Sequence, residues 1–274
     1  MPESHPASPA AVSPAAVSPA EAGPGVFVFT APMYTTTTTV VAGESGGCLV
    51  IDPAITAADL SALAAWLTAR GLVPVAGWST HPHWDHVLWS AELGADVPRY
   101  ATPGAVAVAT RRRAELIQEA DAEVPGHDRP LLADLTALGR DVIPWDGPEA
   151  RVIAHDAHAP GHGAVYLPAR GVLVAGDMVS DVEIPLLGMD SPDPLDAYRA
   201  GLARLASVPG VRVVVPGHGH VGDGAAFRSR VSADAGYLDA LEAGRDVRDP
   251  RLAAGGDWLR AEHARQLKLA LAPE

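Results

Sequence analysis

The chain has 274 residues, of which 48% are hydrophobic and only 5% aromatic, so its core must be built mainly from alanine, valine and leucine. Acidic residues outnumber basic ones by 33 to 20, which gives a formal net charge of −13. A surface this negative argues against a nucleic-acid partner, because such binding depends on lysine and arginine contacts to phosphates.

The single cysteine and the absence of long apolar runs constrain the location of the protein. Cys48 alone excludes an intramolecular disulfide framework, which fits a reducing compartment. The sequence contains no run of about 18 apolar residues, and it does not begin with the basic and apolar regions of a secretory signal. We therefore expect a cytoplasmic protein that neither spans nor partners a membrane.

Residues 1–24 consist mainly of alanine, proline, serine and glutamate, and the pentapeptide AAVSP occurs there twice in succession. Such a segment has too little bulky apolar surface to offset the entropy lost on ordering, so it is predicted to be a disordered tail. The remainder, 25–274, shows no linker and is predicted to form one domain. Helices are expected at its C-terminal end, from about residue 224.

Short runs of β-branched and aromatic residues indicate strands in the first part of this domain. They lie at residues 26–30, 35–42, 47–51 and 75–79. Between the third and fourth strands, Thr56 and Asp59 have the spacing of a capping box, so a helix should begin there. Gly71 is expected to end this helix.

The second part of the domain has a similar order, with strands followed by helices. A helix is predicted over 103 to about 122, whereas 123–150 gives only weak signals. Further strands are predicted at 151–154, 164–167, 172–175 and 211–215, and further helices at 194–206, 225–243 and 256–271. Two successive halves of this kind predict an α/β (α+β) fold, with two packed sheets and helices on the outside.

The strongest functional signal directly follows the strand at 75–79. Three histidines and one aspartate occur within six residues, in the segment Thr80-His81-Pro82-His83-Trp84-Asp85-His86. In an extended chain His81 and His83 project to the same side and can bind one metal ion. Asp85 and His86 follow where the chain turns, so they can face a second ion.

Three further residues of metal-binding type follow apolar strands next to glycine. They are His162 in Pro160-Gly161-His162-Gly163, Asp177 after Gly176, and His218 in Pro216-Gly217-His218-Gly219. Glycine allows the backbone to turn sharply where a strand ends. Any one of these fragments would suit a simple turn, but in this order after the first cluster they support one another.

Together these residues resemble the metal-binding pattern of the metallo-β-lactamase-like hydrolases. The resemblance covers about residues 26–222 and implies a four-layer αββα sandwich forming a single catalytic domain. It implies a first metal bound by His81, His83 and His162, a second bound by Asp85, His86 and His218, and Asp177 as the bridge between them. It further implies that Asp52 braces the metal-binding loops.

The resemblance implies two divalent metal ions, zinc in the first instance, with manganese or iron as alternatives. A hydroxide held between two such ions would attack a small ester, thioester or lactone, with Asp85 and Asp177 as the catalytic carboxylates. A phosphodiesterase using the same metals is the main alternative. An iron-dependent redox enzyme and a non-catalytic metal-binding scaffold are the others. The expected partner is a small-molecule substrate, and the expected state is a monomer or homodimer.

Within the superfamily the chain is similar to the glyoxalase II and lactonase branch, without a subfamily assignment. No basic cluster of the kind that binds glutathione follows Asp177. Met178-Val179-Ser180 stands where related lactonases often have a tyrosine. Several residues near the motifs remain open between packing and substrate contact: Tyr34, Trp84, Trp89, Ser180, Asp181 and Glu183. Others are expected to orient ligands or to support the fold: His155, His158 and His220.

Overall fold

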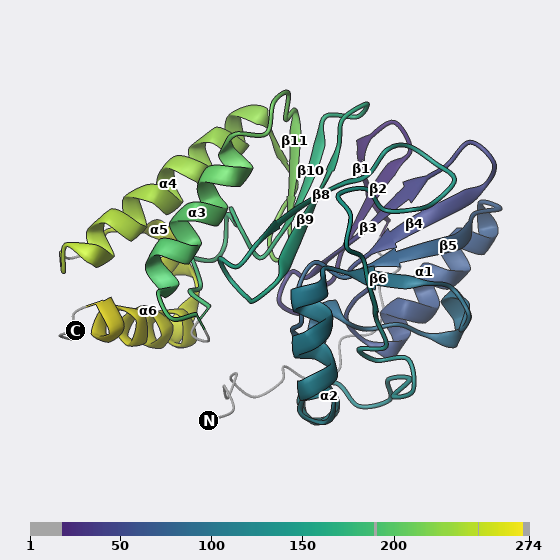
Figure 1. Ribbon diagram of the computed structural model, residues 1–274, viewed down its shortest axis with the longest axis horizontal. Coiled ribbons are helices and arrows are strands. Elements are labelled where there is room, and N and C mark those ends of the chain that lie inside the picture. The colour runs from purple at the N-terminus through teal and green to yellow at the C-terminus, as the bar shows by residue number, and fades with distance from the viewer. Residues whose placement is uncertain (1–17, 189–190, 246, 271–274) are drawn as a thin grey trace.

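The computed structural model describes residues 18–188, 191–245 and 247–270, and it contains two β-sheets (Figure 1). The first sheet has the strand order β1 (Ala20–Gly23), β2 (Val26–Thr30), β3 (Thr37–Ala42), β4 (Gly47–Ile51), β5 (Val73–Trp78), β6 (Arg99–Ala101) and β7 (Thr136–Ala137). The second has the order β12 (Gly222–Asp223), β11 (Val213–Pro216), β10 (Val172–Gly176), β9 (His162–Leu167) and β8 (Arg151–His155).

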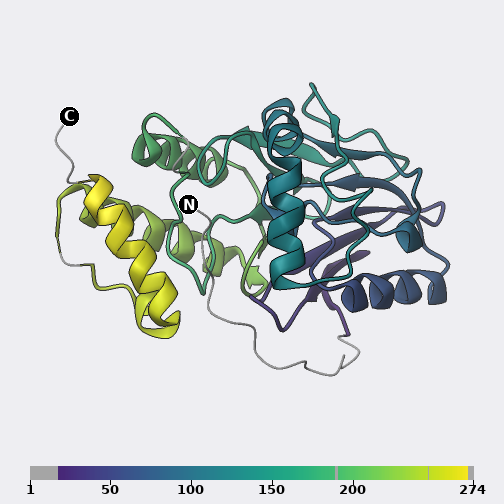
Figure 2. The ribbon, with the colours of Figure 1, turned by 90° about the horizontal axis from the view of Figure 1, so that it is seen from below.

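Helices cover the outer faces of both sheets. α1 (Ala57–Ala69) and α2 (Pro103–Glu123) accompany the first sheet, together with the short 3₁₀ turns η1 (Trp84–His86) and η2 (Ala91–Leu93). α3 (Pro194–Ala206), α4 (Gly224–Glu242), α5 (Pro250–Ala254) and α6 (Gly256–Ala270) accompany the second. Seen from below, α1 and the C-terminal helices lie on opposite sides of the strands (Figure 2). The predicted αββα sandwich is therefore confirmed.

Alternation of side chains along the strands produces the four layers. In β4, Leu49 and Ile51 point into the core between the sheets, whereas Val50 packs with the residues of α1 and α2. In β10, Val174 lies in the same central core, whereas Leu173 packs with α3 and α4. Because successive strand residues face opposite ways, one apolar strand can contribute to two cores at once.

The helix after β4 is built as its sequence predicts. The Thr56 hydroxyl accepts a hydrogen bond from the Asp59 amide, and the Asp59 carboxylate accepts one from the Thr56 amide. This capping box satisfies two amides that a helix N-terminus leaves unpaired. Gly71 follows the helix in the left-handed region at φ 66°, which glycine adopts without strain.

The structure differs from the predictions mainly in short elements. β1 lies within the segment assigned to the disordered tail, so that assignment extends too far, and residues 1–17 are outside the described part of the chain. β6, β7, β12 and α5 were not predicted, because elements of two to five residues carry too little periodicity. β9 begins at His162, two residues before its predicted start.

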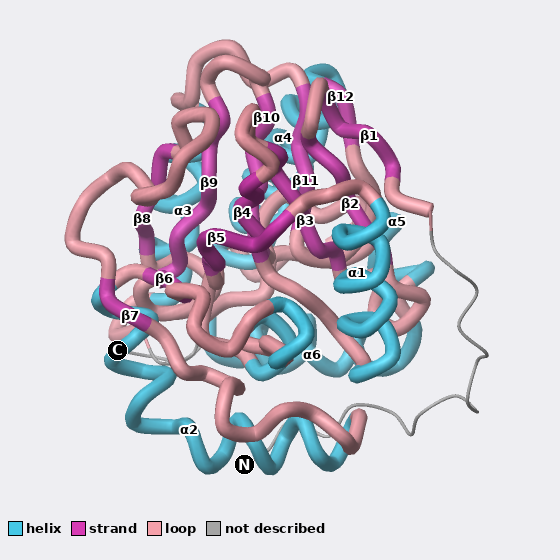
Figure 3. The backbone as a smooth tube through the Cα atoms, turned by 90° about the vertical axis from the view of Figure 1, so that its right-hand side faces the viewer, coloured by secondary structure: helices cyan, strands magenta, loops and turns pink. Residues whose placement is uncertain are grey.

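Loops and parallel strands determine where functional side chains can gather. Much of the chain between β6 and β8, apart from α2 and β7, is loop (Figure 3), in line with the weak signals over 123–150. β4 and β5 run parallel, as do β10 and β11. In open sheets ligands bind beyond the carboxyl ends of such strands. No helix in the described ranges is long and apolar enough to cross a membrane.

Candidate metal centre

The candidate metal centre lies where four strands end. Asp52 directly follows β4, the histidine cluster begins three residues after β5, Asp177 directly follows β10, and His218 comes two residues after β11. His158 lies in the connection between β8 and β9. Residues far apart in the sequence are thus brought to one edge of the sandwich.

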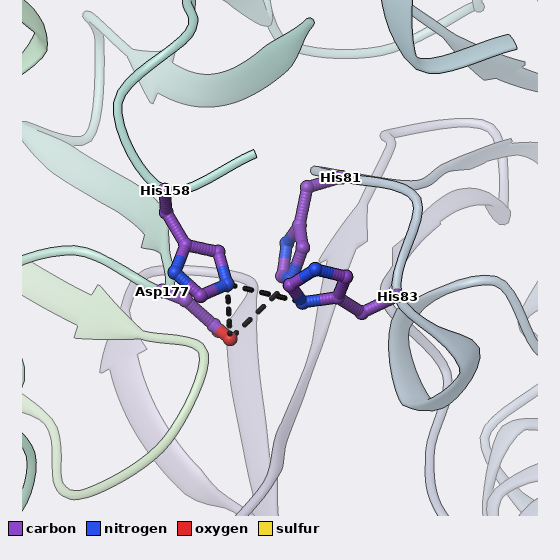
Figure 4. Close-up of side chains that lie close together, drawn as sticks. All are labelled: His81, His83, His158 and Asp177. Carbon is purple, nitrogen blue, oxygen red and sulfur yellow. Dashed lines mark hydrogen bonds and ion pairs between the residues drawn. The ribbon is translucent and has the colours of Figure 1, made fainter. Parts of the chain in front are cut away.

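Four of these side chains form what we call the first group: His81, His83, His158 and Asp177 (Figure 4). The Nδ1 atom of His83 lies 3.1 Å from Nε2 of His81 and 3.0 Å from Nε2 of His158. The Oδ2 atom of Asp177 lies 3.3 Å from Nε2 of His81 and 3.4 Å from Nε2 of His158. Ligand atoms bound tetrahedrally to one zinc ion are also about 3.3 Å apart.

Asp85, His86 and His218 form the second group. The Nε2 atoms of His86 and His218 are 3.3 Å apart. Asp85 Oδ2 lies 3.2 Å from Nε2 of His218 and 3.5 Å from Nε2 of His86. These are the three residues that the sequence pattern assigns to a second metal.

Asp177 connects the two groups. Besides its contacts in the first group, its Oδ1 lies 3.3 Å from His86 Nε2 and its Oδ2 lies 3.4 Å from His218 Nε2. The Oδ1 atom is buried and has no hydrogen-bond partner among the described residues. A buried carboxylate oxygen that no hydrogen bond satisfies needs a positive charge beside it, which a protonated His86 or a metal ion can supply. The two groups and Asp177 therefore fit a pair of divalent metal ions.

Asp52 positions histidines of both groups. Its Oδ2 accepts a hydrogen bond from the Thr80 hydroxyl at 2.6 Å and lies 3.0 Å from His86 Nδ1. The Thr80 hydroxyl, having donated to Asp52, can accept from His81 Nδ1 at 3.0 Å. This arrangement leaves Nε2 of both histidines as the free ligand atom and orients the rings, as carboxylates behind metal-binding histidines commonly do.

Backbone carbonyls orient two more of the histidines. The Nδ1 atom of His158 lies 2.9 Å from the carbonyl oxygen of Leu186, and Nδ1 of His218 lies 3.0 Å from that of Tyr34. Because a carbonyl only accepts, each Nδ1 must carry the proton, which leaves Nε2 directed toward Asp177.

The structure places His162 outside the first group, where the sequence analysis expected it as a metal ligand, and its ligand role stays a prediction. His162 is not a member of the first group, and His158, predicted to have a supporting role, occupies that place. The His162 ring instead stacks on His81 on one side and on His155 on the other, with centroid distances of 5.1 and 4.4 Å. The cause is local: residue 162 already belongs to β9 and pairs with His155 in β8, so its direction is set by the sheet.

Burial and charge favour neutral histidines in the first group, at His83 and His158, and protonated histidines in the second group. Burial lowers the pKa of His158 to about 4. It also lowers the pKa of His83 well below its usual value, and neighbouring histidines add to both effects. Burial would also lower the pKa of His86, but Asp177, Asp85 and Asp52 outweigh it and raise the value to about 9. The pKa of His218 is likewise raised, mainly by Asp177 and Glu183. In the absence of metal, protons on the second group therefore balance the carboxylates.

Glycine is required where β11 leads into the centre. A side-chain carbon at Gly217 would lie 1.9 Å from Asp177 Oδ1 and 3.0 Å from the His86 ring. Any larger residue would push Asp177 and His86 away from their positions. The backbone at residue 217 can therefore approach these side chains only because this residue is glycine.

The structure shows what is contacted by several residues whose role the sequence did not decide. Trp89 is buried and donates from Nε1 to the Gly94 carbonyl, so it supports the core. The Ser180 hydroxyl donates to the carbonyl of His218 at 2.8 Å. The hydroxyl of Tyr34 donates to Glu123 at 2.9 Å, which ties the loop before β3 to the end of α2. Glu183, whose role the sequence left open, interacts electrostatically with His218 and His86 of the second group.

Comparison with known proteins gives sequence and structural relatives. A hydroxyacylglutathione hydrolase from Ruegeria pomeroyi is 28% identical over 157 residues, which are 57% of this chain and 53% of that protein. The chain thus spans about half the length of the curated relatives it matches. A β-lactamase domain protein from Burkholderia ambifaria superposes with a TM-score of 0.67 at 20% identity, over 95% of this chain and 90% of that one.

A second solved structure has a higher sequence identity to this chain than the Burkholderia ambifaria protein has. The protein TTHA1623, solved in a di-iron-bound form, has a TM-score of 0.58 and 28% identity, over 72% of this chain and 94% of that one. The sequence model of the metallo-β-lactamase superfamily matches residues 32–218, a range that includes every member of the first and second groups. The chain belongs to the metallo-β-lactamase superfamily.

Proposed function

We propose that this chain is a metal-dependent hydrolase of small esters, thioesters or lactones. The observation that carries the proposal is the convergence of the first and second groups on Asp177, whose Oδ1 is buried without a hydrogen-bond donor. Such a cluster of ligand atoms costs folding free energy unless cations offset it. We therefore expect the cluster to serve chemistry rather than stability alone.

Two divalent cations would be held by these side chains. His81, His83, His158 and Asp177 would hold the first, and Asp85, His86, His218 and Asp177 the second. Zinc is the metal we expect from this mixture of imidazole and carboxylate, with manganese and iron as alternatives. When bound, such cations would lower the pKa of a water molecule and would polarise the bond under attack.

The chain's own residues would orient the reactants and move protons. His86 and His218 pull the pKa of Asp85 down against the opposing effect of burial, so this carboxyl stays ionised at neutral pH. We assign Asp85 the roles of orienting the attacking water and accepting its proton. Asp52 and Thr80 would keep the histidine rings in place while this happens.

The proposed substrate class rests on charge and on the relatives. The net charge of −13 disfavours phosphate-rich polymers and leaves small molecules as the expected substrates. The relative from Ruegeria pomeroyi is named for hydrolysis of an acyl group on glutathione, which supports acyl-bond cleavage here. The match covers about half of that protein, so it supports the kind of bond cleaved and not the identity of the thiol or alcohol released.

The test combines metal analysis with paired substrates. Elemental analysis of protein purified without chelator should give about two metal ions per chain. The loaded protein should hydrolyse aryl esters and thioesters faster than bis-aryl phosphodiesters. Asp177→Ala and Asp85→Ala should each lower kcat/KM by more than about a hundredfold, because loss of a metal's outer hydrogen-bond partner alone costs 10- to 100-fold.

A matched control removes the exposed carboxylate of Glu149, which pairs with Arg151. Glu149→Gln should keep full activity and metal content, with the same circular dichroism spectrum as the two site variants. Faster cleavage of the phosphodiester would replace the proposal with a phosphodiesterase. Full metal loading without turnover of any probe would leave a metal-binding scaffold.

A further inference from the structure

Arg251 in α5 is a buried arginine that is paired with two carboxylates. Its Nε and Nη2 atoms donate to the two carboxylate oxygens of Asp249 at 3.0 and 2.8 Å, which fixes the plane of the guanidinium. Its Nη1 atom donates to Oδ1 of Asp234 in α4 at 2.6 Å. Arg251 is only 6% exposed and Asp234 is 0% exposed, so these charges meet inside the protein.

The same Nη1 atom reaches the loop that follows β10. It donates to the carbonyl of Ser180 at 3.1 Å and to the carbonyl of Glu183 at 2.8 Å. Between these two carbonyls the chain forms a tight turn, in which the Ser180 hydroxyl accepts from the amides of Val182 and Glu183. Arg251 therefore holds both ends of this segment, which we call the 180–183 turn.

The 180–183 turn contacts the second group through Ser180. The Ser180 hydroxyl donates to the carbonyl of His218 at 2.8 Å. Two residues separate Ser180 from Asp177, and one of them, Val179, has a φ of 51°, which a β-branched residue rarely adopts. Such a conformation persists only where the surrounding contacts enforce it. The bond from the guanidinium to the carbonyl of the next residue is one such contact.

Burying Asp234 is unfavourable for folding. Its Oδ2 atom is buried and has no hydrogen-bond partner among the described residues. Burial raises the pKa of its carboxyl to about 6, even though Arg251 acts in the opposite direction. Buried ion pairs often contribute no more to stability than apolar side chains of similar volume would. The pair is therefore better explained by the loop geometry that it enforces than by stability.

We propose that Arg251, held by Asp234 and Asp249, is a positioning residue of the metal centre. By fixing the 180–183 turn, it would keep the backbone of His218 at the place from which the ring reaches the ion of the second group. This proposal rests on the proposed function, since it concerns the geometry of the same centre. Arg251 would touch neither the metal ions nor the substrate.

Metal affinity provides a test that does not depend on turnover. Metal-free protein is titrated with Co²⁺, and both the heat of binding and the visible absorption of the bound ion are recorded. His218→Ala identifies the binding event of the second group, because it removes a ligand of that ion alone. In Arg251→Lys, which keeps the charge and loses the planar fork, this event should weaken by about ten- to a hundredfold, as when an outer partner of a metal ligand is lost. The ion of the first group should keep most of its affinity.

Ser180→Ala tests the route by which Arg251 acts. It removes the hydroxyl that joins the 180–183 turn to His218 and leaves the guanidinium in place. This variant should weaken the same binding event, and the double variant Ser180→Ala/Arg251→Lys should lose little more than either single variant. Fully additive losses would show that Arg251 does not act through Ser180 and would overturn the proposal.

Arg99→Lys is the matched control. Arg99 is 8% exposed, pairs with Asp134, and donates to the carbonyls of Ala95, Val97 and Asp134, so it anchors loops in the same manner. None of these residues is a member of the first or second group. The control should lose stability and keep both Co²⁺ affinities and the absorption spectrum. Equal weakening of Co²⁺ binding in Arg99→Lys and Arg251→Lys would overturn the proposal, because the effect would then be a general loss of stability.

Kinetics separate this proposal from the proposed function. In the fully loaded protein Arg251→Lys should lower kcat for an aryl ester and leave KM nearly unchanged, because the guanidinium contacts no substrate. If wild-type protein binds both Co²⁺ ions but cleaves no ester or thioester, the proposed function fails, and the Co²⁺ affinities still decide. Weaker binding at the second group in Arg251→Lys then supports the positioning role, and unchanged binding rejects it.

Discussion

His158 and His162 are four residues apart, and among the described residues only the ring nitrogens of His158 make polar contacts. His158 Nε2 lies 3.4 Å from Asp177, and its Nδ1 is held by the Leu186 carbonyl. Both ring nitrogens of His162 are buried without a hydrogen-bond partner among the described residues. The ring of His162 stacks on His81, whereas Nε2 of His158 is directed toward Asp177.

Replacing each histidine with phenylalanine distinguishes these roles, because it removes the ring nitrogens and keeps a planar ring. We expect His158→Phe to retain about one metal ion per chain or fewer, and His162→Phe to retain about two, since only the first loses a ligand. Elemental analysis after equilibration with a slight excess of zinc measures the difference. The opposite pattern would restore His162 to the first group and remove His158 from it.

The sequence predicted six of the seven members of the two groups because they directly follow recognisable strands or form one dense cluster. It favoured His162 because Pro160 and Gly161 precede it, a pattern typical of a turn. The true start of β9 at His162 depends on pairing with β8, which is a tertiary contact. For Glu183 the sequence left packing and substrate contact open, because the position of this residue depends on Ser180, His218 and Arg251.

At the scale of elements, helix α2 packs against the turn that leads into β9. The Thr102 hydroxyl, which caps α2, donates to the carbonyl of Gly161. A side-chain carbon at Gly161 would lie 2.2 Å from the amide nitrogen of Ala105, and Gly161 has a φ of 73°. The helix N-terminus and this turn can approach so closely only because the residue is glycine.

Gly161→Ala should therefore lower the free energy of unfolding by about 2 kcal/mol or more, because it adds left-handed strain to a steric overlap. Urea unfolding of the metal-free protein measures this. Gly139→Ala is the matched control, since a side-chain carbon there meets nothing within 4 Å and its backbone is not in the left-handed region. Equal stability of the two variants would show that α2 can shift to make room.

Long elements with clear periodicity, such as α1, α2 and α3, were predictable within one or two residues. The C-terminal helices were predicted too, but not their contribution to the site. The side chain of Gln266 in α6 accepts a hydrogen bond from the Leu187 amide, and Leu186 in turn holds His158. This connection arises from packing between distant segments, which no local pattern encodes.

At the scale of the whole molecule, metal binding and protonation compete for the same histidines. In the metal-free protein the pKa of His86 is raised to about 9, and that of His218 is raised well above its usual value. A raised histidine pKa stabilises the fold fully below about pH 6.5, and this stabilisation is lost as pH rises through about 9. Metal ions require neutral imidazoles, so their binding must displace these protons.

The stability difference between metal-loaded and metal-free protein should therefore widen between about pH 7 and about pH 8.5, by up to roughly 1.4 kcal/mol per pH unit for each displaced proton. The metal-free protein loses stability over this range, while the loaded protein has no proton left to lose from these two residues. Thermal unfolding of both forms across the range provides the measurement.

Asp177→Ala provides the internal comparison for this pH dependence. Among the groups that raise the pKa of His86 and of His218, Asp177 has the largest effect on both. Without it, both histidines should lose their protons nearer to neutral pH, so the metal-free variant should lose less stability as the pH rises. If the stability of loaded and of metal-free wild-type protein changed with pH in parallel, no proton would leave the second group on metal binding. Asp85, His86 and His218 would then not hold the second metal.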